Sequence, residues 1–170
     1  TGLTLHADPG HLLGNLVIGG LFLVLLSRDL GPGLSWLLAF VSGAAGNALN
    51  VMVQSLPHIS VGWSTSVFGI VGSLSGLRLM EGRGPGWTRR LLPLPAGLGL
   101  LALLGAGGGN TDLGAHLFGF GAGLLAGLGT GFFELGRRFR SPLPDRLFLA
   151  GALGLVACCW FLALSFGRVD

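Results

Sequence analysis

Residues 113–133 read LGAHLFGFGAGLLAGLGTGFF, an apolar run whose one ionisable side chain is His116. A helix needs about 20 such residues to cross the hydrocarbon core of a lipid bilayer. Five other stretches qualify or come close, and they cover residues 11–27, 34–53, 64–80, 91–106 and 147–166. The sequence therefore predicts an all-α, polytopic transmembrane helix bundle with six transmembrane helices in this chain.

The composition agrees with a chain whose solvent is mostly lipid. Hydrophobic residues make up 51% of the 170 positions and charged residues 10%, against about 25% charged residues in an ordinary globular domain. So few charges cannot cover a water-facing surface, which excludes a soluble domain. Long apolar runs between the glycines exclude disorder and collagen. Without a long linker, residues 1–170 are expected to form a single domain.

The basic residues are distributed unevenly between the two sides of the predicted bundle. All ten are Arg, and they lie in short connectors between apolar runs, which does not indicate nucleic-acid binding. Only Arg168 falls on one side; the other nine share the opposite side: Arg28, Arg78, Arg83, Arg89, Arg90, Arg137, Arg138, Arg140 and Arg146. The Arg-rich side is expected to be cytoplasmic, so that residue 1 lies outside.

Four polar side chains lie where lipid would make them costly. His11 and Asn15 begin the first apolar stretch, Ser64 begins the third and His116 begins the fifth. Those three stretches run in one direction, so the four side chains are expected at one depth near the outer face. A hydroxyl, an imidazole and an amide together favour nucleophilic hydrolysis, because a Ser needs a base and the oxyanion needs donors. Two His without nearby acids or Cys make a poor metal site, so we expect no metal and no cofactor.

Three segments around these residues resemble the motifs of rhomboid intramembrane serine proteases. HADPGHLLGN at residues 6–15 is similar to the family's HxxxxHxxxN, GWSTSVFG at 62–69 to its GxSxxxxG, and AHLFGFGAG at 115–123 to its AHxxGxxxG. The resemblance covers about residues 5–131. It implies that the family's first helix precedes residue 1, and that residues 147–166 form the additional C-terminal helix of some members.

The resemblance also implies roles for the polar residues. Ser64 would be the nucleophile and His116 the general base, in a dyad without an acid. His11 and Asn15 would bind the oxyanion with the Ser64 backbone N–H, and Phe68 would pack on the catalytic imidazole. No Asp or Glu lies within the six stretches, which agrees with a dyad. The implied activity is that of a serine endopeptidase that cleaves transmembrane segments of other membrane proteins.

Glycines near these residues predict unusually close helix packing. Gly119 and Gly123 form a GxxxG pattern on one stretch, and Gly62 and Gly69 accompany the nucleophile. Small residues let helix backbones approach closely in lipid. A Ser and a His on different helices can share a hydrogen bond only if those helices nearly touch. Trp63 stands where the family usually has a small residue, and we expect it to reshape the substrate cleft.

Several residues also have ordinary structural interpretations. Ser64 could be a helix N-cap, and Asp112, four residues before His116, could orient that imidazole or simply be solvated. Asn47 and Asn50 are expected to make interhelical hydrogen bonds. The outer-loop residues His6 and His58 are expected to be structural or solvated, and Cys158 and Cys159 to be core or lipid-facing.

Two other functions remain open at the level of the sequence. One is a non-catalytic, rhomboid-like protein that binds membrane clients. The other is a small transporter, which would show broken helices or repeated halves.

The composition also bears on where the protein resides. Arg without Lys, with abundant Ala, Gly and Leu, is typical of a GC-rich bacterial genome. We therefore expect a multi-pass protein of the bacterial cytoplasmic (inner) membrane, with its active site towards the outer face.

Overall fold

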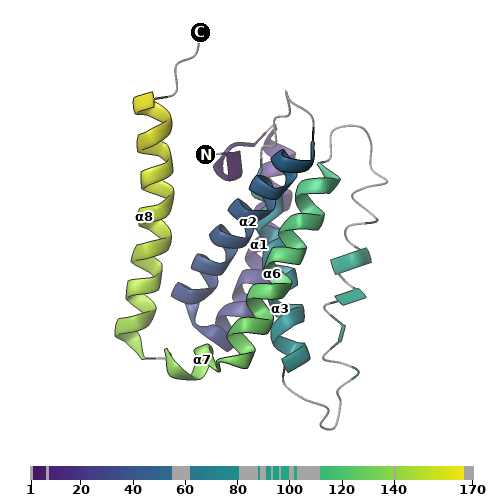
Figure 1. Cartoon of the computed structure of the whole chain (residues 1–170), viewed down its shortest axis with the longest axis vertical. Coiled ribbons are helices and arrows are strands. Elements are labelled where there is room, and N and C mark those ends of the chain that lie inside the picture. Colours follow the sequence, from purple (N-terminus) through teal and green to yellow (C-terminus); the bar gives the residue numbers. More distant parts are fainter. Residues whose placement is uncertain are drawn as a thin grey trace.

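The structure is a computed structural model that describes residues 2–6, 8–54, 62–80, 112–139 and 141–166, with isolated positions between 88 and 102. Its elements, in chain order, are η1 (Gly2–Thr4), α1 (Pro9–Leu30), α2 (Pro32–Val53), α3 (Ser64–Met80), α6 (Leu113–Phe132), α7 (Leu135–Arg138) and α8 (Pro142–Phe166). Figure 1 shows α1, α2, α3 and α6 gathered in one bundle, with α8 along its side. The predicted all-α membrane bundle is therefore confirmed.

Five of the six predicted stretches are helices, and half of the sixth, residues 91–106, lies outside the described residues. Among the described residues, α1, α2, α6 and α8 are long and apolar enough to cross a membrane, whereas α3 has only 17 residues. Both α1 and α8 begin earlier than predicted, at Pro9 and Pro142, because Pro suits the first turn of a helix. The longer helices include two acidic residues at their ends, Asp29 and Asp145.

The short helix α3 is the centre of the bundle. Every residue from Thr65 to Leu77 is buried, and the helix packs against α1, α2 and α6. A helix that is buried all round needs no polar face, and α3 has apolar and small residues on every side. Enclosure by longer helices explains how a helix of this length occupies the membrane interior.

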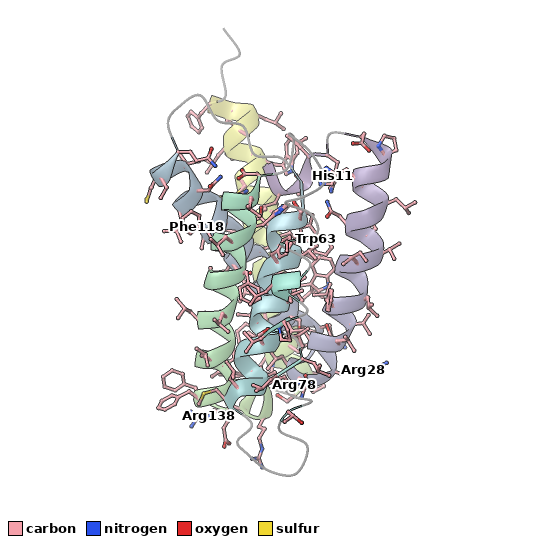
Figure 2. All side chains as sticks on the ribbon, turned by 90° about the vertical axis from the view of Figure 1, so that its right-hand side faces the viewer. His11, Arg28, Trp63, Arg78, Phe118 and Arg138 are labelled. Atoms are coloured by element: carbon pink, nitrogen blue, oxygen red, sulfur yellow. The ribbon has the colours of Figure 1, made fainter. Side chains whose placement is uncertain are left out.

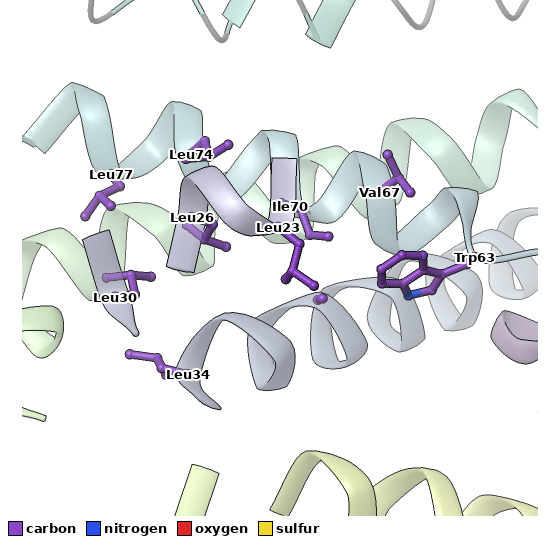
Figure 3. Packing of buried hydrophobic residues seen from close by; sticks show 10 residues of the cluster. Leu23, Leu26, Leu30, Leu34, Trp63, Val67, Ile70, Leu74 and Leu77 are labelled. Atoms are coloured by element: carbon purple, nitrogen blue, oxygen red, sulfur yellow. The ribbon is translucent and has the colours of Figure 1, made fainter. Parts of the chain in front are cut away.

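One apolar core joins α3 to α1 and to the start of α2. In Figure 3 leucines from α1 face aliphatic side chains of α3 along the length of the contact, with Trp63 at one end. The buried residues of this core are Leu23, Leu26, Leu30, Leu34, Ala39, Trp63, Val67, Ile70, Leu74 and Leu77. Their spacing of three or four residues places them on one face of each helix.

The opposite side of α3 packs against α6 through glycines. A Cβ on Gly119 would lie 2.5 Å from the carbonyl oxygen of Thr65, and a Cβ on Gly123 would overlap the backbone of Gly69. From the other side, a Cβ on Gly72 would overlap the carbonyl oxygen of Phe120. Each helix thus leaves space for the other's backbone, and the two approach as closely as GxxxG patterns allow.

Helix α8 packs along α2 and leaves most of its own surface exposed. Ala152 is its one buried residue, but its first turn reaches the start of α2. There the Asp145 carboxylate accepts a hydrogen bond of 2.8 Å from the Gly33 N–H. The N-cap of α2 is Gly31, which has no side chain to offer, so a carboxylate from α8 satisfies this helix end instead.

The two ends of the bundle differ in charge. Figure 2 shows Arg28, Arg78 and Arg138 near one end and His11 at the other. At the Arg end, Arg78 of α3 forms an ion pair with Asp29 of α1. The described arginines therefore gather on the side that the sequence assigns to them, away from the predicted catalytic residues.

Candidate active site

Ser64 and His116 meet where α3 and α6 begin. The His116 Nε2 and the Ser64 Oγ are 2.7 Å apart, the distance of a good hydrogen bond. Ser64 is the first residue of α3, and His116 lies in the first turn of α6. Because the two helices run in the same direction and touch through glycines, their first turns bring hydroxyl and imidazole together at one depth.

An aromatic ring holds the imidazole in place. The rings of Phe68 and His116 are stacked with their centroids 4.6 Å apart and their planes at 29°. Phe68 is only 1% exposed and lies one helical turn after Ser64, so α3 supplies both the hydroxyl and the platform for the imidazole. Stacking restricts the ring to orientations in which one nitrogen faces Ser64.

The second nitrogen of this imidazole has no described partner. His116 Nδ1 is buried and lacks a hydrogen-bond partner among the described residues. For Nε2 to accept the proton of Ser64, the neutral ring must carry its own proton on Nδ1. The geometry therefore allows a two-residue arrangement in which Phe68 orients the base.

Asp112 caps the helix that carries His116. Its side chain accepts a hydrogen bond from the Ala115 N–H at 3.0 Å, and its two oxygens accept from Asn50 Nδ2 at 3.0 and 2.8 Å. These bonds confirm the interhelical contact predicted for Asn50, whereas the Asn47 Oδ1 has no partner among the described residues. Asp112 thus fixes the start of α6 against α2 and sets the height of His116 through the backbone, a role that its spacing alone did not reveal.

Asn15 has a buried amide donor that has no acceptor among the described residues. The side chain is 8% exposed, and its Nδ2 has no hydrogen-bond partner among the described residues. His11 lies one turn earlier on the same face of α1. Buried polar groups in proteins are nearly always paired, so an unpaired amide one helical turn from the His11 imidazole is available to a bound group.

His11 packs over the turn that precedes Ser64. A Cβ on Gly62 would lie 2.6 Å from the His11 Cε1, so the imidazole occupies the space of a side chain at that position. Gly62 also has a φ of +120°, which L-residues rarely adopt. Glycine is therefore required at residue 62 for two reasons, and the His11 imidazole lies against the backbone two residues before Ser64.

His6 belongs to this neighbourhood, although sequence reasoning gave it only a structural or solvated role. Its ring lies edge-on to His11, with the centroids 5.4 Å apart, and its Nε2 is 3.5 Å from the backbone nitrogen of Trp63. Burial and the nearby charge of His11 both lower the pKa of His6, which favours the neutral acceptor form. The repeated His spacing was the available signal, while His58 lies outside the described residues.

Trp63 points away from the dyad and into the core. Its indole stacks on Trp36 of α2, with the centroids 5.5 Å apart, and its ring edge fills the space opposite Gly19 of α1. The residue is 9% exposed. Its described contacts are those of a packing residue that fixes the start of α3 between α1 and α2, rather than those of a side chain lining a cleft.

Comparison with known proteins agrees with this arrangement. The family model of the rhomboid domain matches residues 1–132. Over 127 residues the chain is 31% identical to a protein of Bacillus subtilis (strain 168) named "Putative rhomboid protease YdcA". That alignment covers 74% of this chain and 62% of the relative, so the chain spans about three fifths of the relative's length. No solved structure matches. The matched residues contain η1, α1, α2, α3 and α6, with every residue of the candidate site, and the chain belongs to the rhomboid family.

Proposed function

We propose that the chain is an intramembrane serine endopeptidase in which Ser64 is the nucleophile and His116 the general base. The observation that carries this proposal is the 2.7 Å distance between His116 Nε2 and Ser64 Oγ, which joins two membrane helices. A Ser hydroxyl becomes a useful nucleophile when a base within hydrogen-bond reach takes its proton.

The acylation step uses the Ser64–His116 pair and the oxyanion donors. As the Ser64 Oγ bonds to the peptide carbonyl carbon, His116 Nε2 takes the hydroxyl proton and the carbonyl oxygen becomes an oxyanion. Asn15 Nδ2 and His11 donate to that oxygen, together with the Ser64 N–H at the start of α3. When the C–N bond breaks, the His116 imidazolium gives its proton to the departing amine.

The acyl-enzyme is then hydrolysed by the same residues. His116 takes a proton from water as the water oxygen attacks the ester carbonyl carbon. The second oxyanion occupies the place of the first, and its collapse breaks the ester bond. The proton returns to Ser64 Oγ, and the new carboxyl end of the substrate leaves.

The position of the site indicates the substrate. The dyad lies at the start of two membrane helices, at the end of the bundle opposite the described arginines (Figure 2). A transmembrane segment of another protein can reach this depth, but helix hydrogen bonds hide its carbonyl groups, so it must unwind locally to be cleaved. With the Arg end in the cytoplasm, the site faces the outer side of a bacterial cytoplasmic membrane.

Labelling with a fluorophosphonate tests the proposal directly. In the full-length protein in detergent, we expect wild type to be labelled and Ser64→Ala not to be. His116→Ala should lose nearly all labelling and cleavage, and the double variant should be little worse than either single one, because the two residues act as a unit.

Ser73→Ala is the matched control, because it removes a buried hydroxyl of the same helix that has no partner among the described residues. It should be labelled like wild type. Normal cleavage of a transmembrane substrate by Ser64→Ala would overturn the proposal. Wild-type protein that retains a membrane client but is never labelled would instead indicate the non-catalytic alternative.

A further inference from the structure

Helix α8 lies beyond the residues that match the rhomboid domain, and its packing against the described helices is mainly along α2. The match ends at residue 132, whereas α8 spans Pro142–Phe166. Its side chains are exposed apart from Ala152 and a few half-buried positions. Among the described residues, a hydrogen bond near each end also joins it to the bundle: Asp145 bonds to the start of α2, and Trp160 bonds to η1. Figure 1 shows α8 alongside the bundle, with the N-terminal segment near its far end.

The contact at the far end leads towards the active site. Trp160 donates a hydrogen bond of 3.0 Å from Nε1 to the Oγ1 of Thr4, the last residue of η1. At the other end of η1, the Gly2 carbonyl oxygen accepts a hydrogen bond of 2.9 Å from the Gly62 N–H. The three-residue η1 therefore connects α8 to the turn that precedes Ser64.

That turn is the part of the site whose conformation the helices alone do not fix. Gly62 has a φ of +120°, lies under the His11 imidazole, and stands two residues before Ser64. A hydrogen bond to the Gly62 N–H therefore sets where α3 begins relative to His11. A small displacement of this turn is expected to slow the reaction strongly, since a shift near 1 Å can lower the rate roughly a hundredfold.

We propose that Trp160 is a positioning residue, through which α8 holds η1 against the Gly62 turn and so aligns Ser64 with its oxyanion donors. The inference rests on the proposed proteolytic function. An indole suits residue 160 of α8, because its apolar ring system is compatible with lipid and its N–H can donate a hydrogen bond near the membrane surface. Helix α8 then supports the site although it contributes no group to the chemistry.

Two substitutions remove the hydrogen bond, one with a smaller aromatic ring and one with a side chain of the same shape. Trp160→Phe keeps an aromatic ring without the N–H, and Thr4→Val replaces the hydroxyl with a methyl group. We expect each to slow fluorophosphonate labelling of Ser64 by about two- to tenfold, the usual worth of one hydrogen bond. The double variant should be no slower than the singles, because both remove the same bond.

The kinetic pattern separates positioning from folding. Cleavage by Trp160→Phe should show a lower kcat with an unchanged KM and an unchanged thermal unfolding temperature. Phe161→Leu, at the neighbouring 67% exposed position of α8, is the matched control and should behave like wild type. Amide hydrogen exchange at Gly62 gives a readout that needs no activity, and it should be several-fold faster in Trp160→Phe than in Phe161→Leu.

The inference is overturned if exchange at Gly62 is the same in Trp160→Phe and Phe161→Leu. It is also overturned if the losses in Thr4→Val and Trp160→Phe multiply in the double variant. These outcomes differ from failure of the proposed function, which would leave wild type unlabelled while its Gly62 exchange could still respond to Trp160.

Discussion

Asn15 is the residue whose environment is hardest to explain by stability alone. A buried amide donor without a partner costs about 1–3 kcal/mol, and neighbouring positions of α1 are filled by Leu, Val and Ile. Functional groups are often retained at the expense of stability. An amide whose role is to donate to an oxyanion needs no permanent partner, and Asn15 Nδ2 has none among the described residues.

Replacing this amide should therefore separate activity from stability. Asn15→Leu should lower kcat by about 10²–10³, or 2.7–4 kcal/mol, the usual loss for one oxyanion donor. The unfolding temperature should stay the same or rise, because the substitution removes an unpaired buried polar group. Ser64 should still be labelled slowly, since Asn15 does not activate the nucleophile.

The control is Gly14→Ala, the preceding position, where an added Cβ meets nothing within 4 Å. It should leave both rate and unfolding temperature unchanged. Full activity of Asn15→Leu together with full activity of His11→Ala would refute the oxyanion assignment. Unfolding of both variants would show instead that the two residues hold the bundle together.

At the scale of helices, the distance between α3 and α6 decides whether Ser64 can reach His116. A Cβ on Gly119 would approach the Thr65 carbonyl oxygen to 2.5 Å and the Thr65 Cγ2 to 2.9 Å. Backbone cannot move aside as a flexible side chain can. Gly119→Ala should therefore push the helices apart, with overpacking strain of about 1–3 kcal/mol and a rate loss of roughly a hundredfold.

Gly121→Ala is the matched control, because it makes the same change on the same helix where nothing lies within 4 Å. It should have wild-type stability and labelling. Gly151→Val on α8, which is equally open, should also be mild. If Gly119→Ala and Gly121→Ala are equally active in a cleavage assay, close approach of α3 and α6 is not what the dyad needs.

The helices were predictable because lipid demands long apolar runs. The contact between Ser64 and His116 was predictable because the runs that carry them place both side chains at one depth. The helix ends were less predictable. Pro9 and Pro142 begin helices whose first turns contain polar residues, and a prediction based on apolar runs leaves those turns out. Partners such as Asp112 and Asn50 stand 62 positions apart, and local sequence carries no signal for pairing them. The same holds for Trp160 and Thr4, whose contact depends on how η1 and α8 are placed.

At the scale of the whole molecule, charge determines which way the bundle faces. In a variant with Cys158 and Cys159 replaced by Ala, a single cysteine at Leu5 should react with an impermeant thiol reagent added to intact cells. A single cysteine at Ser141 should react only after the cells are opened. Both positions are exposed in the structure, and they flank opposite ends of the bundle. The reverse pattern of labelling would put the site on the cytoplasmic side.

The carboxylate that caps α2 has a consequence for how the protein is made. Gly33 and Asp145 are 112 positions apart, so a ribosome adding about 5–20 residues per second reaches Asp145 some 6–20 s after Gly33. Until then α2 lacks this acceptor for its first turn. The nascent α1–α2 hairpin therefore enters the membrane before the N-terminal end of α2 has this acceptor, which α8 supplies later in synthesis.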